Sequence, residues 1–386
     1  MRGIMALSFE QGPIRPPSEA RSLLLRVTRN CPWNKCEFCN IYKGKTFERR
    51  SVQEVKQDIE AVREIYDDIQ AISWRYGFGG QVNDAVIQSI WRDPGRYPDS
   101  YRSVAAWMYF GADRVFLQDA NSLIVETEDL VEILNFLRKK FPSIRRITSY
   151  ARSGTLRRKT LEELVALREA GLSRIHVGME SGSDDVLKIM KKGVTAAQHV
   201  EAGQKVVASG ISLSEYMLLG LGGRRWWREH AVESAKVINR INPHFIRMRT
   251  LTILPGMPLY DRLASGEFEL QSEEEIVREE RLFIQNLEGV TSYLASDHIL
   301  NLLEEVEGEL PGDKEKMLGV IDEYLALPER DRLIYNLGRR GQAYRSVRDL
   351  QDIGLKRRVE AALERFMAEH PEDPAIAFNS LRNGFI

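Results

Sequence analysis

The sequence predicts an α/β protein built from parallel strands, and three observations lead to this class. Short apolar runs alternate with amphipathic helical segments six times along residues 22–287. Two of the helical segments begin at a capping box, and one of these ends at a glycine. Helices between successive strands are typical of right-handed crossovers that join parallel strands. The pattern alone is compatible with an open barrel or with a doubly wound sheet.

Each expected element rests on its periodicity. The capping boxes are Ser51 with Glu54 and Thr160 with Glu163, and Gly171 ends the second of these helices. The expected strands are 22–28, 114–120, 144–151, 173–180, 211–220 and 244–253. The expected helices are 51–66, 127–141, 160–171, 183–209, 226–241 and 272–287.

The domain organisation follows from where this alternation starts, breaks and stops. Residues 1–21 contain three prolines and are expected to form an extended lead-in. Residues 22–300 are expected to form the α/β domain. They include an insertion, residues 70–112, that is rich in glycine and aromatic residues and too long for one connection. Residues 301–386 are helix-like and charged, without strand signals, and are expected to form a helical C-terminal extension.

Composition limits the class of protein. The formal net charge is -1, so no global field favours nucleic acid or anionic lipid. Three cysteines do not make a disulfide framework, and a reducing cytosol is their natural setting. No apolar run of about 18 residues and no N-terminal signal segment is present. We therefore expect a soluble, cytoplasmic protein that does not bind a membrane.

All three cysteines lie within nine residues, at Cys31, Cys36 and Cys39, in the spacing C-x4-C-x2-C. A [2Fe–2S] cluster with this local spacing needs a fourth, distant cysteine, which the chain lacks. A zinc site also needs a fourth ligand, and no histidine stands in zinc-knuckle spacing to the thiols. The interpretation we favour is a [4Fe–4S] cluster with one iron not bound by the protein. Zinc, or unliganded buried thiols, are the alternatives.

The cysteine loop resembles that of the radical S-adenosylmethionine (SAM) superfamily, in which C-x3-C-x2-C follows the first strand. Phe38, directly before the last cysteine, fits that loop, and the extra residue after Cys31 departs from it. The stretch "RIHVGMESGSDDVLKIMKKG" (174–193) resembles the elongator-like and coproporphyrinogen-oxidase-like branches. The resemblance implies a partial (β/α)6 barrel, followed here by the helical C-terminal extension.

The resemblance also implies residues that bind SAM. Asp119 and Asn121 stand where the family has a motif for the SAM amino group, although the usual Gly-Gly-Glu is absent. Glu180 would contact SAM, with Ser181 shaping the turn, and Gly220 lies in the segment beside the adenine. The simpler alternatives are a turn cap for Asp119, a helix cap for Glu180 and a loop role for the glycine.

By the same resemblance, a reduced [4Fe–4S] cluster passes an electron to SAM, and the resulting 5′-deoxyadenosyl radical removes hydrogen from the substrate. The electron would come from an external one-electron reductant such as flavodoxin or ferredoxin. No residue is assigned a catalytic role, and the reaction class is open: oxidoreductase, lyase, isomerase or transferase. A non-catalytic protein that binds an iron–sulfur cluster or zinc is the alternative outside the enzymes.

Strand alternation suggests the substrate class. If Ile246 and Met248 face the helices, Arg247 and Arg249 point into the barrel, where Arg26 is expected to join them. Arginines in a water-poor cavity require anions. Arg247 is assigned to the SAM carboxylate, and the substrate is expected to be a small anionic metabolite. The alternatives are a structural ion pair of one arginine with Glu215, and an RNA substrate.

Overall fold

The α/β class is confirmed by the computed structural model, which describes residues 7–370 and 374–384. One eight-stranded, mostly parallel sheet has the strand order β1-β4-β5-β6-β7-β8-β9-β10. All six expected strands are present: β1 (Leu23–Arg26), β4 (Arg114–Gln118), β5 (Arg146–Ala151), β6 (Leu172–Glu180), β7 (Ser212–Leu219) and β8 (Phe245–Thr250). This architecture is that of a radical-SAM-type partial barrel.

The chain divides into two compact units. Among the described residues, the first comprises 7–32, 44–176 and 208–212, and the second comprises 33–43, 177–207, 213–370 and 374–384. The division falls within the long strand β6 and within the cysteine loop, so neither unit corresponds to one of the expected domains.

In the first unit, β1, β4 and β5 pair in parallel, with Leu25 opposite Leu117 in the centre of the first pair. Helix α1 (Val52–Arg75) begins at the predicted Ser51 capping box and runs beyond its predicted end. It packs against α4 (Thr127–Lys140) and α3 (Asp99–Tyr109). The remaining helices are α5 (Ser153–Leu156), α6 (Leu161–Glu169) and the short turns η1 (Pro17–Glu19) and η2 (Ser122–Ile124).

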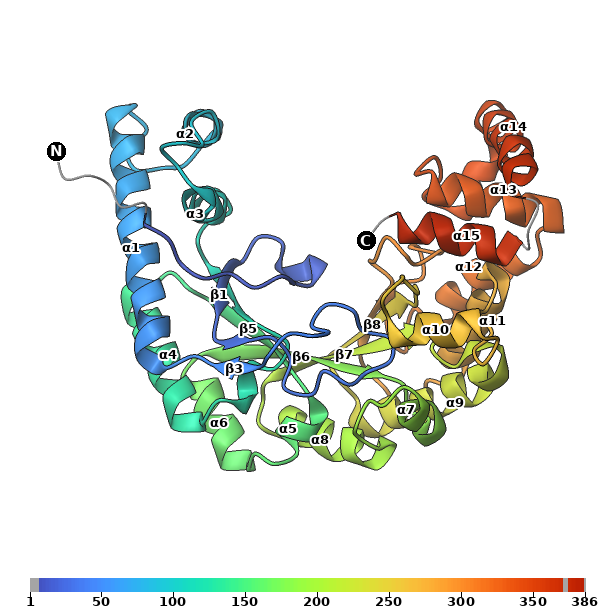
Figure 1. The fold of residues 1–386 in the computed structure, drawn as a ribbon, viewed down its shortest axis with the longest axis horizontal. Coiled ribbons are helices and arrows are strands. Elements are labelled where there is room, and N and C mark those ends of the chain that lie inside the picture. The colour runs from blue at the N-terminus through green and yellow to red at the C-terminus, as the bar shows by residue number, and fades with distance from the viewer. Residues whose placement is uncertain (1–6, 371–373, 385–386) are drawn as a thin grey trace. The chain divides into compact units, whose positions relative to one another are not determined.

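The insertion 70–112 is largely helical. It contains the end of α1, then α2 (Asp84–Trp91) and α3, which pack against each other. Figure 1 shows α2 and α3 alongside the C-terminal half of α1. The glycines of this segment occupy the turn after α1, where Gly77, Gly79 and Gly80 have positive φ angles.

In the second unit, β7, β8 and β9 (Tyr293–Ala295) are parallel, and β10 (Gly308–Glu309) is antiparallel to β9. The single helix expected over 183–209 was wrong: α7 (Asp184–Ile189) and α8 (Ala196–Ala208) are separate. The break between them contains Lys191 and Gly193, both with positive φ, which an α-helix does not accommodate. Helices α9 (Gly223–Ile241), α10 (Pro258–Ala264) and α11 (Glu273–Gln285) complete the alternation.

The C-terminal extension is helical, as expected, but the prediction that it lacks strands was wrong because β10 lies within it. Its helices are α12 (Lys314–Leu325), α13 (Glu329–Arg340), α14 (Ile353–Glu369) and α15 (Pro374–Asn383), with the turn η3 (Val347–Gln351). Figure 1 shows α13 and α14 next to each other. A buried ion pair of 2.8 Å between Arg340 and Glu273 ties α13 to the start of α11.

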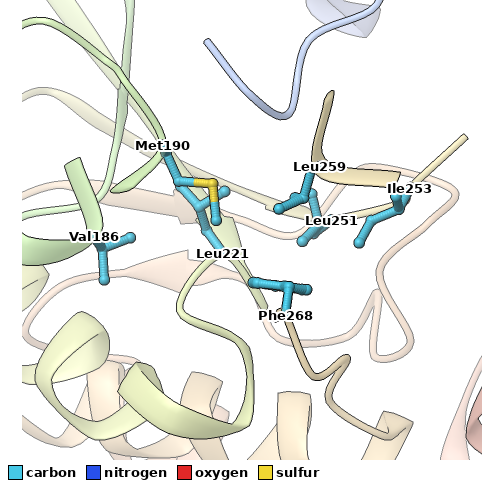
Figure 2. Close-up of a cluster of buried hydrophobic side chains, with 7 residues drawn as sticks. All are labelled: Val186, Met190, Leu221, Leu251, Ile253, Leu259 and Phe268. Atoms are coloured by element: carbon cyan, nitrogen blue, oxygen red, sulfur yellow. The ribbon is translucent and has the colours of Figure 1, made fainter. Parts of the chain in front are cut away.

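A cluster of buried apolar side chains lies in the second unit. Its members come from α7 and α10 and from segments that follow α7, β7, β8 and α10. Figure 2 shows that it is assembled from short segments distant in the sequence. Its members are Val186, Met190, Leu221, Leu251, Ile253, Leu259 and Phe268. The side chain of Phe38, from the cysteine loop, packs against this cluster. Among the helices of the described residues, none combines the length and apolar character needed to cross a membrane.

Candidate functional site

The cysteine loop is bounded by two short strands that pair with each other, β2 (Thr28–Arg29) and β3 (Glu48–Arg49). None of the three cysteines is in a disulfide, and all three are partly exposed. Within residues 7–370 and 374–384, no group of three or more cysteine, histidine or acidic side chains is close enough to hold a metal ion. The three thiols are thus not gathered into a metal site in this structure, and the donor set for a [4Fe–4S] cluster with an open iron rests on their spacing in one short segment. Their convergence on a common centre stays a prediction.

The start of the loop is fixed by Asp119. Its carboxylate accepts the backbone N–H of Asn30 at 2.9 Å and pairs with the guanidinium group of Arg26 at 2.6 Å. Arg26 also pairs with Glu10 at 2.9 Å, so the lead-in contributes to this network. Asp119 is thus a buried anchor of the residue before Cys31, and not only a turn cap. Its predicted contact with the SAM amino group stays untested.

Asn121 lies close in the sequence but serves other partners. Its Oδ1 accepts the backbone N–H of Arg152 at 3.0 Å, and its Nδ2 donates to Thr155 Oγ1 at 2.8 Å. The side chain is fully buried and joins the end of β4 to α5. These contacts use both ends of the amide, so its predicted role at SAM has no direct support.

The second half of the loop is fixed in the second unit by the two residues that precede Cys39. Phe38 packs against the apolar cluster of Figure 2. The backbone N–H of Glu37 donates to the Met190 carbonyl at 3.1 Å, and its carbonyl accepts from Leu259 at 3.0 Å. Glu37 and Phe38 together place the segment between Cys36 and Cys39 against the ends of α7 and α10.

Glu180 ends β6 and carries the unusual backbone angle φ +66°. A non-glycine residue rarely adopts this left-handed conformation, and such residues cluster at functional sites. The Glu180 carboxylate pairs with the Nζ atom of Lys192 at 3.1 Å, and Lys192 also lies 5.7 Å from the centre of the Phe38 ring. A Cβ atom at Gly178 would overlap the Glu180 carboxylate, so the glycine provides the space for this ion pair.

Helix α9 holds the turn after Glu180. The Nε2 atom of His230 lies 3.1 Å from the Glu180 carbonyl oxygen, and Ser234, one helical turn later, accepts the Gly182 N–H at 2.8 Å. The Ser181 hydroxyl accepts the N–H of Ser183, which is the N-cap of α7. The alternative in which Glu180 caps that helix is therefore wrong. Ser181 shapes the turn, as expected, and its contact with SAM stays a prediction.

Gly220 ends β7 with φ +85°, a conformation that favours glycine. Its N–H donates to Glu279 of α11 at 3.1 Å, and the same carboxylate oxygen contacts His230 Nδ1 at 2.9 Å. Gly220 and the Glu180 turn are thus connected through one buried histidine and one buried glutamate. The proximity of Gly220 to adenine stays a prediction.

Glu215 of β7 is a buried carboxyl group in the same region. Burial raises its pKa well above the ordinary value, and the charge of Glu180 adds to this, although Lys192 opposes it. One of its oxygens has no hydrogen-bond partner among the described residues. The raised pKa favours the neutral form of Glu215, and Lys192 forms its ion pair with Glu180.

Arg247 and Arg249 share the carboxylate of Asp297, at 2.7 Å and 3.1 Å. Ile246 and Met248 are fully buried, as expected for the face of β8 opposite the two arginines. That the arginines point into the barrel stays a prediction. Neither arginine has Glu215 as an ion-pair partner among the described residues. Arg26, which was expected to join them, pairs with Asp119 and Glu10 within the first unit.

The sequence model of the radical SAM superfamily matches residues 25–235, which is more than half of the chain. The chain therefore belongs to the radical SAM superfamily. Members of this superfamily are generally enzymes, and the family implies a [4Fe–4S] cluster and SAM as cofactors. The three thiols of the loop suit such a cluster by their chemistry.

Individual relatives are more distant. The chain is 24% identical over 123 residues to the tRNA uridine(34) acetyltransferase of Methanocaldococcus infernus, covering 30% of this chain and 22% of that protein. It thus spans about a fifth of the length of this relative. Similar solved structures include Elp3 of M. infernus (17% identity, TM-score 0.39, 48% of each chain) and methylornithine synthase PylB (14%, 0.42, 73% of this chain and 69% of that one).

Two residues of the site were not anticipated. Lys192 had a signal, because it stands in the basic pair that closes the quoted stretch 174–193. His230 had no usable signal, because a histidine within an amphipathic helix resembles any other core position.

Proposed function

We propose that this protein is a radical SAM enzyme that cleaves SAM reductively and removes hydrogen from a small anionic metabolite. Cys31, Cys36 and Cys39 would hold the [4Fe–4S] cluster. The observation that carries the proposal is the Glu180–Lys192 ion pair, whose lysine lies over the ring of Phe38, the residue before Cys39. An amino-acid binding site beside a three-thiol loop is what this chemistry requires.

The ion pair complements the amino-acid part of SAM. A carboxylate suits the SAM ammonium group and a lysine suits the SAM carboxylate, so Glu180 and Lys192 would each exchange one internal partner for one SAM group. Because this exchange replaces one charge pair with two, little uncompensated charge is buried. In this assignment Lys192, not Arg247, holds the SAM carboxylate. The cluster, when bound, supplies the electron that cleaves SAM.

The substrate and partners are part of the proposal. Arg247 and Arg249 support a small anionic substrate, and an external one-electron carrier such as flavodoxin or ferredoxin would reduce the cluster. Thiols without a disulfide framework support a cytoplasmic location. An RNA substrate is the second candidate, because the M. infernus protein that matches part of this chain is named a tRNA uridine(34) acetyltransferase.

The test uses anaerobically reconstituted protein. We expect about four irons and four sulfides per chain, and slow release of 5′-deoxyadenosine on addition of reductant and SAM. Glu180→Gln and Lys192→Met should each weaken SAM binding about ten- to a hundredfold, since a charge-assisted hydrogen bond contributes about 1.5–3 kcal/mol. Glu229→Gln, an exposed position on α9, is the matched control. Bound zinc without sulfide would overturn the proposal.

A second arm separates the two substrate candidates. Reduced enzyme and SAM are incubated with the small-molecule fraction and, separately, with the RNA fraction of a cell extract. Stimulated 5′-deoxyadenosine release with the small-molecule fraction alone supports a metabolite. Stimulation with the RNA fraction alone supports the RNA candidate.

A further inference from the structure

The two arginines of β8 form a site with more positive than negative charge. Arg247 and Arg249 lie two residues apart on one strand, so their side chains lie on the same face of the sheet. Each contacts a different oxygen of Asp297, at 2.7 Å and 3.1 Å. Two guanidinium groups thus share one carboxylate, and this contact leaves one positive charge uncompensated.

Donor groups at this site also lack partners. The Nε atom of Arg247 and one terminal nitrogen of Arg249, Nη2, are buried and have no hydrogen-bond partner in the part of the chain described. The Arg247 residue as a whole is only 7% exposed. Leaving a buried charged donor unpaired is costly, so the site favours an additional acceptor.

Neighbouring aromatic rings lie against both guanidinium groups. Arg249 lies 4.9 Å from the centre of the Tyr216 ring, and Arg247 lies 5.8 Å from that of Phe245. Stacking of this kind leaves the edges of a guanidinium group available for hydrogen bonds.

His298, next to Asp297, does not provide a negative charge. Burial lowers its pKa to about 4, and Arg249 contributes to this, so the ring is neutral at pH 7. Its Nδ1 accepts the N–H of Leu300 at 3.3 Å, which places the remaining proton on Nε2. The histidine therefore adds a hydrogen-bond donor and leaves the charge of the site unchanged.

We propose that Arg247 and Arg249 bind the single anionic group of the substrate, a carboxylate or a phosphate, and that Asp297 competes with it for the same guanidinium groups. One further negative charge balances the site, and both kinds of group accept the paired donors that arginine presents. Asp297 is one-third exposed at its side chain and lies in the segment after β9, so its carboxylate can withdraw without breaking a strand. The inference rests on the proposed function for the identity of the substrate, but the anion site is testable alone.

The experiment measures binding of inorganic phosphate and, separately, of acetate to the reconstituted holoenzyme by calorimetry. Asp297→Asn removes the competitor and should tighten binding of the preferred probe about tenfold or more. Arg249→Gln should weaken anion binding by a similar factor. Arg249→Lys keeps the charge but loses the forked N–H donors of the guanidinium group, so its affinity should lie between those of wild type and Arg249→Gln. Arg228→Gln, on the exposed side of α9, is the control and should bind as wild type does. The probe that binds more tightly identifies the anionic group.

Three results would overturn the inference. Weaker anion binding by Asp297→Asn would show that Asp297 orients the arginines and does not compete. No binding of either probe to wild type and to a folded Asp297→Asn variant would exclude the site. Mutual exclusion of SAM and phosphate would assign Arg247 to the cofactor. Release of 5′-deoxyadenosine from the same preparations without substrate tests the proposed function separately, so each can fail without the other.

Discussion

The Nε2 atom of His230 lies 3.1 Å from the backbone carbonyl oxygen of Glu180, the residue with φ +66°. A carbonyl oxygen only accepts hydrogen bonds, so Nε2 carries a proton. The other ring nitrogen, Nδ1, contacts the Glu279 carboxylate at 2.9 Å. The histidine is thus fixed at both nitrogens, and it holds the backbone of Glu180 in a conformation that a glutamate rarely adopts.

Loss of this contact should weaken SAM binding without removing the cluster. His230→Ala deletes one buried hydrogen bond to Glu180, and a contribution of about 0.5–1.5 kcal/mol predicts up to about a tenfold weaker affinity for SAM. His230→Gln can still donate an N–H to the carbonyl and should recover part of the loss. Equilibrium dialysis of SAM against reconstituted protein measures both.

His370→Gln, at the end of α14, is the matched control and should leave SAM affinity unchanged. Iron content is measured in every variant, because a loss of cluster would lower SAM binding for a different reason. Equal affinities in wild type and His230→Ala would show that Glu180 holds its conformation without the histidine.

Gly178→Ala should separate SAM binding from stability. The nearest atoms to the new methyl group would be those of the Glu180 carboxylate, which it would overlap, and Lys192 Nζ, which it would crowd; both are ends of flexible side chains, so the fold can adjust at little cost. The Glu180–Lys192 pair cannot keep its geometry, and we expect about ten- to a hundredfold weaker SAM binding with a nearly unchanged free energy of unfolding.

The control for this substitution is Gly319→Ala in α12, where a methyl group meets nothing within 4 Å. It should be neutral or slightly stabilising, because alanine favours a helix more than glycine does. Urea denaturation and SAM dialysis are measured on both variants. A large loss of stability in Gly178→Ala with unchanged SAM affinity would contradict the prediction.

Phe38→Ala should impair assembly of the cluster. The ring anchors the segment between Cys36 and Cys39 to the apolar cluster of the second unit, so its removal frees that segment. We expect fewer irons per chain after reconstitution and faster loss of iron in air. Phe38→Leu keeps an apolar anchor and should retain most of the iron, whereas equal iron contents in wild type and Phe38→Ala would argue against an anchoring role.

The fold was predictable from the sequence where local signals were strong. The six strands and the capping boxes at Ser51 and Thr160 follow from periodicity and from side chains that cap within three residues. The break between α7 and α8 was missed because the left-handed conformation of Lys191 has no sequence signature. Strand β10 was missed because two residues that pair only with β9 carry no periodicity.

The site was less predictable, because its side chains are positioned by contacts with residues that are distant in the sequence. The cysteines and Glu180 followed from a linear motif. Asp119 pairs with Arg26, ninety-three residues earlier, and no local pattern indicates that. Two arginines were expected to require an anion, but their shared partner, Asp297, comes from a segment that follows another strand.

The last prediction concerns Glu280, a buried carboxyl group of α11. Burial, together with the neighbouring Glu279, raises its pKa from 4.5 to about 8. Between these two values the unfolded chain has lost the proton that the folded chain retains, so stability falls as the pH rises. The slope is at most about 1.4 kcal/mol per pH unit for one proton, and it vanishes above the folded-state pKa.

Glu280→Gln remains neutral throughout and should lack this slope, so its stability advantage over wild type grows from pH 5 to pH 8. Urea denaturation at several pH values measures it, with Glu229→Gln on the surface of α9 as a control that should follow wild type. Parallel pH profiles for wild type and Glu280→Gln would mean that Glu280 is ionised in the folded protein.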